Sequence, residues 1–215
     1  MADTRLSRLT KYMQEKGITA VAVNAGPTLT YLTGLHFHLM ERPVVIVLSA
    51  DHEPTIILPE LEQAKLDHLP FPARVYAYGE NPAAWGAMFG DALAGLGLAG
   101  RKVGVEPRQL RLLEYDYLRS ACSGMECIDG SAIFAALRAK KDAEEIACMR
   151  RAVKIAEDAL SATLPLVKIG VTEKEIAGEL FLQLMRHGSE IALPFAPIVA
   201  AGPNGANPHS QPSAR

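Results

Sequence analysis

The last stretch of the chain, residues 193–215, holds the side chain best placed to do chemistry. A short apolar run, Ile198–Ala201, stops at Gly202-Pro203-Asn204-Gly205, and Asn207-Pro208 then leads to a single histidine, His209. Proline and glycine end regular structure, and loops on a rigid scaffold commonly carry binding and catalytic groups. We therefore predict a strand that delivers His209 to the rim of a cleft. The alternative is an ordinary surface loop, because one histidine alone is a weak signal.

Two other patterns have the letters of a functional motif but not its context. His36 and His38 have a spacing by which a strand can place two imidazoles on one face for a metal ion. Two ligands are too few, and no acidic residue or cysteine accompanies them at a diagnostic spacing, so we favour loop histidines. Gly95-x-Gly97-x-x-Gly100 resembles a dinucleotide-binding fingerprint, yet it follows a predicted helix, whereas that motif follows a strand.

The thiols and hydroxyls give no nucleophile. Cys122, Cys127 and Cys148 are an odd number of cysteines without the spacing of a metal site, and no base lies beside them in the sequence. We expect structural thiols. Ser210 follows His209 directly, but sequence neighbours rarely meet in catalytic geometry. The residues alone therefore indicate one suggestive loop and no reaction.

The composition excludes several classes of protein. Hydrophobic residues make up 49% and charged residues 21% of the 215, as in soluble globular chains. With 22 basic and 24 acidic residues the net charge is −2, so we expect neither nucleic acid nor a membrane surface as a partner. Apolar runs such as Val44–Leu48 fall far short of the roughly 18 residues that span a bilayer. The first residues lack an apolar signal core, which predicts a cytoplasmic protein.

Strands alternate with helices over residues 1–132. We predict helices from a cap at Asp3 or Thr4 to Gly17, over 60–68, from a cap at Asn81 to about Leu93, and over 110–121. We predict strands over 18–23, 44–48, 55–58, 75–78, 103–105 and 125–128. This alternation predicts an α/β layered domain with a largely buried, partly parallel sheet.

The pattern changes in residues 133–215. Residues 131–141 form a predicted helical connector, and two capping boxes follow, Asp142 with Glu145 and Thr172 with Glu175. Each box opens an amphipathic helix whose apolar positions repeat every three or four residues. The remaining sequence offers these apolar stripes little to pack against. We therefore predict a first domain over 1–132 and an incomplete second domain over 133–215.

Short motifs spread along nearly the whole chain point to a family. In the first domain they are Arg5-x-x-Arg8-Leu9, Tyr31-Leu32-Thr33-Gly34 and Val103-Gly104-Val105-Glu106. In the second they are Leu137-Arg138-x-Lys140-Lys141 with Glu145-Ile146, Met149-Arg150-Arg151-Ala152, Gly170-Val171-Thr172-Glu173, and Ile198 to Asn204 followed by Pro208-His209 and Arg215. Their order resembles the creatinase/prolidase/aminopeptidase P family, the pita-bread metalloenzymes with an extra N-terminal domain.

This resemblance implies both a fold and a chemistry. The fold class is α/β: a creatinase/prolidase-type N-terminal domain with a mixed sheet, then the start of an α+β pita-bread domain. Family members hold two divalent cations, often manganese, with two Asp, one His and two Glu, and the metal pair activates water to attack an amide, commonly before proline. His209 matches the histidine of the family's Pro-His step, which lies beside the metals as a substrate-binding or proton-shuttling group.

The resemblance also implies what this chain lacks. The five metal ligands of family members lie beyond the segment that matches these residues, so we expect a chain truncated before its ligands, binding no metal and inactive alone. Ser210 stands where a glycine is frequent after the histidine, which bears on the shape of that loop. The expected partners are a peptide or small amide substrate and a second copy of the chain in a homodimer.

Two alternatives stay open at this point. A creatinase-like carbon–nitrogen hydrolase would use the same fold for different chemistry, because a fold does not fix a reaction. A non-catalytic binding or dimerisation module would explain the uncovered apolar stripes equally well.

Overall fold

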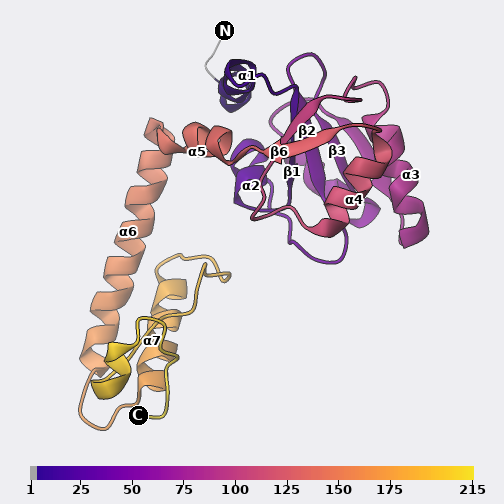
Figure 1. Ribbon diagram of the computed structural model, residues 1–215. Coiled ribbons are helices and arrows are strands. Elements are labelled where there is room, and N and C mark those ends of the chain that lie inside the picture. The colour runs from indigo at the N-terminus through magenta and orange to yellow at the C-terminus, as the bar shows by residue number, and fades with distance from the viewer. Residues whose placement is uncertain (1–3) are drawn as a thin grey trace. The chain divides into compact units, whose positions relative to one another are not determined.

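The computed structural model describes residues 4–215, which divide into two compact units (Figure 1). The first ends at Lys140, and the second is Lys141–Arg215. The contacts thus divide the chain after residue 140, whereas the sequence placed a domain boundary near residue 132. Each unit is described by itself.

The first unit contains the predicted helices and strands in the predicted order, together with a helix over residues 27–33 that the sequence analysis did not predict. Its elements are α1 (Arg5–Glu15), β1 (Ala20–Asn24), α2 (Pro27–Thr33), β2 (Val45–Ser49), β3 (Thr55–Pro59), η1 (Glu60–His68), β4 (Arg74–Tyr78), α3 (Pro82–Leu93), β5 (Lys102–Val105), α4 (Leu112–Ala121), β6 (Glu126–Asp129) and α5 (Ser131–Ala139). Thr4 caps α1 by accepting a hydrogen bond from the Ser7 amide at 3.1 Å, while Asp3 lies outside the described residues. Residues 60–68 form a 3-10 helix.

The strands form one mixed sheet in the order β4-β3-β2-β1-β5-β6. β1 pairs antiparallel with β2, and β2 with β3, whereas the pairs β3–β4, β1–β5 and β5–β6 are parallel. Every residue of β1 and β3 is buried, which agrees with the continuous apolar runs that predicted a covered sheet. The predicted mixed α/β fold is therefore confirmed.

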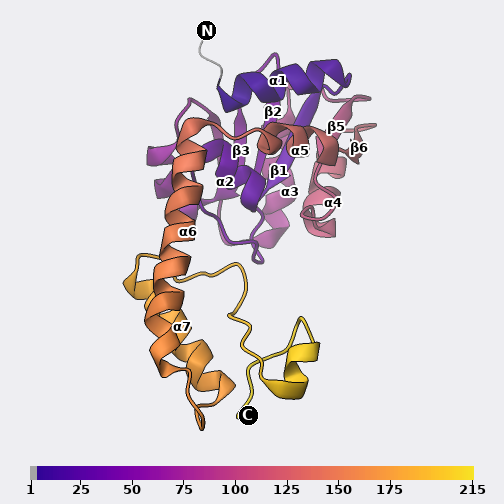
Figure 2. The same cartoon turned by 90° about the vertical axis from the view of Figure 1, so that its left-hand side faces the viewer.

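Alternate residues of each strand face two separate cores. On one face, Val21 and Ile46 join a cluster with apolar side chains of α1, α2 and α5. On the other, Ala22 and Val45 join a cluster with side chains of α3 and α4. Figure 2 shows α1 and α5 in front of the sheet, with α3 and α4 behind it. A sheet covered on both faces by helices follows directly from the two-residue period of a strand.

Helix α5 is part of the first unit's core and not merely a connector. Its Ile133, Phe134 and Leu137 are 1–2% exposed. A Cβ atom at Gly130, just before α5, would lie 3.0 Å from the Phe134 ring and 3.2 Å from the backbone of Gly104. Only glycine allows this close approach. The sequence analysis noted the polar end of this segment and missed its apolar face, whose residues recur every three or four positions.

The second unit begins with the two predicted capped helices, α6 (Ala143–Thr163) and α7 (Glu173–Arg186). Both capping boxes are present, with Asp142 accepting from the Glu145 amide and Thr172 from the Glu175 amide. The 3-10 turns η2 (Leu164–Leu166) and η3 (Gly202–Ala206) complete its elements. Figures 1 and 2 both show α6 beside α7.

The strand predicted over Ile198–Ala201 is wrong. This segment is irregular and leads into η3. A strand exists by pairing with a neighbour, and the sheet of the described chain is built only from residues of the first unit. The apolar run therefore lacked the partner that would have made it a strand.

The apolar stripe of α6 is largely exposed. Ile146, Met149, Val153 and Leu160 are 40–57% exposed. Within residues 141–215, all of which the structure describes, the buried residues are Ala159, Thr163, Glu173 and Ser210. The sequence predicted stripes with little to cover them, and the stripe of α6 is found in that state. Across residues 4–215, no helix has both the length and the apolar character to cross a bilayer.

Candidate functional site

The segment that carries His209 is held by one buried side chain, Glu173. Thr172 caps α7, so Glu173 is the first residue of that helix, and it is only 2% exposed. Residues 201–213, here named the histidine loop, curve around its carboxylate. The loop contains η3, the Asn207-Pro208 step and His209.

Every hydrogen bond to the Glu173 carboxylate comes from the histidine loop. The amide of Ala201 donates to Oε1 at 2.6 Å, and the side-chain amide of Asn204 donates to both oxygens at 3.0 Å. The amide and hydroxyl of Ser213 donate to Oε2 at 2.9 and 2.7 Å. Hydrogen bonds from Ser213, then Ala201 and Asn204, lower the pKa of Glu173 from 4.5 to about 2. Glu173 is therefore an ionised carboxylate whose two oxygens both accept hydrogen bonds.

The start of α7 also holds the end of the loop through its backbone. The amide of Glu173 donates to the carbonyl of Arg215 at 2.8 Å, and that of Lys174 to the carbonyl of Ser213 at 3.1 Å. Amides in the first turn of a helix have no partner inside the helix, so these bonds satisfy two of them. At Gly202, where φ is +56°, a Cβ atom would meet the Arg215 guanidinium at 3.0 Å. The backbone of the loop is thus fixed at both ends.

His209 itself is exposed on this loop. Its amide donates to Asn207 Oδ1 at 3.0 Å, and the amide of Ser210 donates to the Asn207 carbonyl at 3.1 Å. None of residues 4–215 forms a hydrogen bond with the imidazole. Ser210 is 8% exposed and is no candidate nucleophile beside the histidine. The arrangement presents an imidazole with both ring nitrogens open to a bound molecule, which suits hydrogen bonding or proton transfer.

The other candidates do not gather around this loop. His36 and His38 are exposed and lie between α2 and β2. Gly95, Gly97 and Gly100 follow α3 with positive φ and precede β5, so the dinucleotide interpretation fails on context. In the part of the chain that the structure describes, no three His, Cys, Asp or Glu side chains lie close enough to hold a metal ion. These residues do not fit a dimetal centre, and we derive no step through one.

The cysteines are structural or surface thiols. All three are free, and Cys148 is exposed. Burial raises the pKa of the Cys122 and Cys127 thiols. A raised pKa keeps a thiol neutral and weakly nucleophilic.

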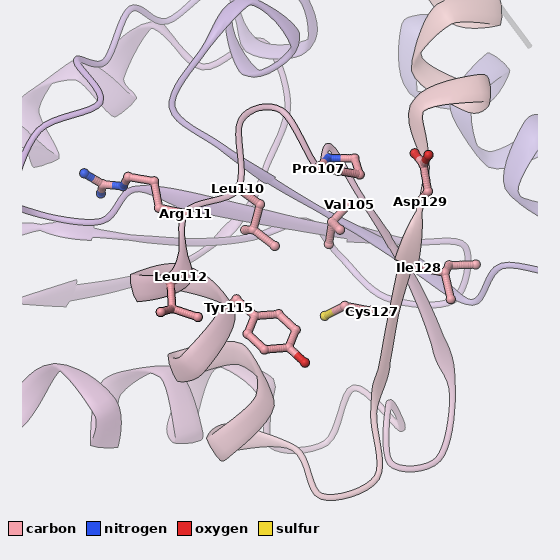
Figure 3. A pocket seen from close by; sticks show the side chains of 9 residues that line it. All are labelled: Val105, Pro107, Leu110, Arg111, Leu112, Tyr115, Cys127, Ile128 and Asp129. Atoms are coloured by element: carbon pink, nitrogen blue, oxygen red, sulfur yellow. The ribbon is translucent and has the colours of Figure 1, made fainter.

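The first unit contains a pocket of about 360 Å³ at the carboxyl ends of β5 and β6 (Figure 3). It is lined by Val105, Pro107, Leu110, Arg111, Leu112, Tyr115, Cys127, Ile128 and Asp129. Its two charged residues have partners: Arg111 pairs with the buried Glu114, and hydrogen bonds from Ser131 lower the pKa of Asp129. No residue predicted to do chemistry lines it, so we do not take it as the functional site.

Sequence reasoning missed Glu173, Asn204 and Ser213 as parts of the site. Glu173 stood in a quoted motif but was given no role, because an acidic residue in the first turn of a helix is ordinarily a solvated one. The signal that could have found the site was a pair of hydrogen-bond donors on either side of His209, Asn204 before it and Ser213 after it. The role of His209 stays a prediction.

Two family models and several known proteins match this chain. A family model described as the Creatinase/Prolidase N-terminal domain matches residues 5–140, and one described as Metallopeptidase family M24 matches residues 147–215. An Xaa-Pro dipeptidase from Lactobacillus helveticus is 26% identical over 209 residues, covering 97% of this chain and 56% of that protein.

Solved structures agree with this assignment. A dipeptidase from Pyrococcus horikoshii OT3 is 30% identical with a TM-score of 0.85, covering 99% of this chain and 57% of that one. A prolidase from Thermococcus sibiricus is 26% identical with a TM-score of 0.86, over 98% and 57%. The chain therefore spans somewhat more than half the length of these relatives. Since the first family model alone covers most of the residues, the chain belongs to the creatinase/prolidase family.

Proposed function

We propose that the protein carrying this chain is an Xaa-Pro peptidase, a hydrolase that cleaves the amide bond before proline in peptides. The observation that carries the proposal is the match of 97% of the chain to a relative named as an Xaa-Pro dipeptidase. The likeness to a prolidase and a dipeptidase of known structure supports it. Because the chain spans about 57% of those two proteins, the activity is proposed for the protein that contains it.

We infer that this protein uses two divalent cations, with manganese as the proposed metal. Such a pair would supply an activated water and a polarised scissile carbonyl. The match of residues 147–215 to a metallopeptidase family supports the metal dependence. The ligands are proposed to come from residues other than those described here.

For His209 we propose the role of substrate-binding or proton-transferring group beside the reaction centre. Its support is an exposed imidazole on a loop whose backbone is fixed by Glu173. An imidazole changes its charge near neutral pH, so it can give or accept a proton there. His209→Ala is expected to lower kcat/KM by about a hundredfold. His187→Ala, the same change at another exposed histidine of the same unit, is the matched control.

The test is an assay of the natural protein with Xaa-Pro dipeptides, after metal removal and after adding manganese, cobalt or magnesium. We expect hydrolysis that depends on the metal and that spares dipeptides without proline. Absence of Xaa-Pro turnover with every metal would refute the proposal. The 215 residues alone are assayed as a second sample, and the family resemblance predicts that they hydrolyse no Xaa-Pro dipeptide.

A creatinase-like hydrolase is the second candidate, because the family model for residues 5–140 covers creatinases as well as prolidases. Both enzymes hydrolyse a carbon–nitrogen bond on related folds, so the substrate decides between them. Creatine is therefore included in the assay. Turnover of creatine in place of Xaa-Pro dipeptides would favour this candidate.

We also propose a homodimer in the cytoplasm. The three free cysteines agree with a reducing compartment. Sedimentation of the natural protein tests the dimer, and fractionation of cells tests the location. The exposed apolar residues of α6 would also suit a non-catalytic binding module. A protein that forms a stable complex but hydrolyses no substrate would favour that alternative over an enzyme.

A further inference from the structure

We propose that Glu173 is a positioning residue for His209, acting by fixing both ends of the loop that carries the histidine. The catalytic part of this proposal rests on the proposed function. The structural part, that one carboxylate sets the conformation of residues 201–213, stands on the geometry alone.

The hydrogen bonds lie on both sides of the histidine in the sequence. Ala201 and Asn204 precede His209 and reach the carboxylate at 2.6 and 3.0 Å. Ser213 follows it and reaches the second oxygen at 2.7 Å. Asn204 also donates to Ser213 Oγ at 3.3 Å, which joins the two sides directly. The ends of the loop are therefore held together at a single point.

The chemistry of this point requires a carboxylate. All groups from the loop that face Glu173 are donors: two backbone amides, one side-chain amide and one hydroxyl. An ionised carboxylate accepts on both oxygens and donates nothing, so it satisfies them all. Glutamine has nearly the same shape but replaces one acceptor with an NH₂ group. At 2% exposure that NH₂ would face loop donors with little water to separate them.

The position of the imidazole follows from the backbone of the loop. The hydrogen bond from the His209 amide to Asn207 fixes the turn, while the described residues leave the ring itself unbonded. The main chain sets where the Cα and Cβ atoms of His209 lie, and therefore which positions the ring can reach as it turns about its side-chain bonds. A change at Glu173 is therefore expected to move the imidazole without touching it.

The test compares Glu173→Gln with Glu175→Gln in the natural protein. Both changes remove one negative charge from the first turn of α7, but Glu175 bonds to Thr172 and not to the loop. We expect Glu173→Gln to lower kcat/KM at least about tenfold, as misplacement of a catalytic group does, and Glu175→Gln to change it less than about twofold. Similar losses in the two variants would overturn the proposal.

A double variant separates positioning from a general loss of structure. If Glu173 acts through His209, then Glu173→Gln added to His209→Ala lowers kcat/KM no further. A purely structural role predicts the same additional loss in both backgrounds, and that result would also overturn the proposal. Should Glu173→Gln fail to fold, Ser213→Ala removes one hydroxyl donor and is expected to give a smaller loss with the same non-additivity.

Hydrogen exchange tests the geometry without reference to activity. Peptides covering residues 201–213 are expected to exchange at least about tenfold faster in Glu173→Gln than in the wild type and in Glu175→Gln. Unchanged exchange would refute the fixing of the loop. If the wild type hydrolyses no Xaa-Pro dipeptide, the proposed function fails, while this exchange result still decides the structural part.

Discussion

We expect Glu173 to make the second unit sensitive to acid. Its pKa in the folded chain is about 2, against an ordinary value of 4.5, chiefly because Ser213 and Ala201 donate hydrogen bonds to the ionised form. A group whose pKa is lowered by folding stabilises the fold fully above its ordinary pKa, and the contribution is lost as the pH falls toward the lowered value. The relevant window therefore runs from about pH 4.5 down to pH 2.

We predict that the wild-type chain loses order in the histidine loop over this window and that Glu173→Gln does not show the same loss. Urea unfolding of both proteins at several pH values gives the comparison, because the difference between them isolates position 173. A titration of the labelled Glu173 carboxyl by NMR is expected to give a midpoint near 2. A midpoint at the ordinary value would contradict the prediction.

Arg111 and Glu114 form an ion pair in the first unit, and its carboxylate is buried. The guanidinium Nε lies 3.0 and 3.1 Å from the two carboxylate oxygens, and Glu114 is fully buried. Arg111 also donates to the carbonyl of Met40, which holds the segment before β2. Removal of the arginine leaves the Glu114 carboxylate without this partner.

We expect Arg111→Ala to lower the free energy of unfolding by about 3 kcal/mol, the low end for a broken buried pair because the Arg111 side chain is 30% exposed. Arg119→Ala, an exposed position on the same helix, is the control and is expected to change it by less than about 0.5 kcal/mol. Urea denaturation followed by tryptophan fluorescence measures both. Equal effects would show that the pair contributes nothing of its own.

Helix starts depend on neighbouring residues, and α7 offers a direct test. Thr172 accepts from the Glu175 amide, and Glu175 accepts from the Thr172 amide at 2.8 Å. We predict that Thr172→Ala costs about 1 kcal/mol of stability of the second unit, whereas Thr172→Ser, which keeps the hydroxyl, costs a few tenths. Circular dichroism at 222 nm during urea unfolding gives both values. If Thr172→Ser lost as much stability as Thr172→Ala, the capping hydrogen bond would be excluded as the cause.

Elements that depend only on nearby residues could be predicted from the sequence. Thr4, Asn81, Asp142 and Thr172 each cap the helix expected from the sequence, because each cap bonds a backbone amide only two or three positions away. The run Ile198–Ala201 was wrongly predicted as a strand, since a strand needs a partner that no local pattern supplies. The candidate site divided in the same way: the loop with His209 was evident in the sequence, but its support by Glu173 spans 40 residues and was not.

The two units differ in how much apolar surface they bury. Both clusters of buried apolar residues that the described chain contains lie between Leu9 and Leu137, in the first unit. The second unit buries Ala159 and three polar residues and leaves much of the stripe of α6 in water. Burial of apolar surface is the main stabilising contribution to folding, so the units are expected to differ in their independence.

We predict that residues 1–140 fold by themselves with one cooperative thermal transition, whereas residues 141–215 do not. The measurement is differential scanning calorimetry of the two fragments, with Phe89→Ala in the first as an internal check. Phe89 is fully buried and stacks on Tyr117 at 5.0 Å, so its removal is expected to cost about 3 to 5 kcal/mol. A cooperative transition in residues 141–215 would contradict the prediction.

The hydrogen bonds of Glu173 also bear on the order in which the chain acquires its structure. Ser213 lies 40 residues after Glu173 and Ala201 lies 28 after it, so the loop must close over a long segment of chain before any of these bonds form. Closing a segment costs entropy that grows with its length, and the bonds form only around a helix end that already exists. We therefore expect the capped start of α7 to form early in refolding and the histidine loop to reach its final conformation among the last steps, after most of the fold has formed.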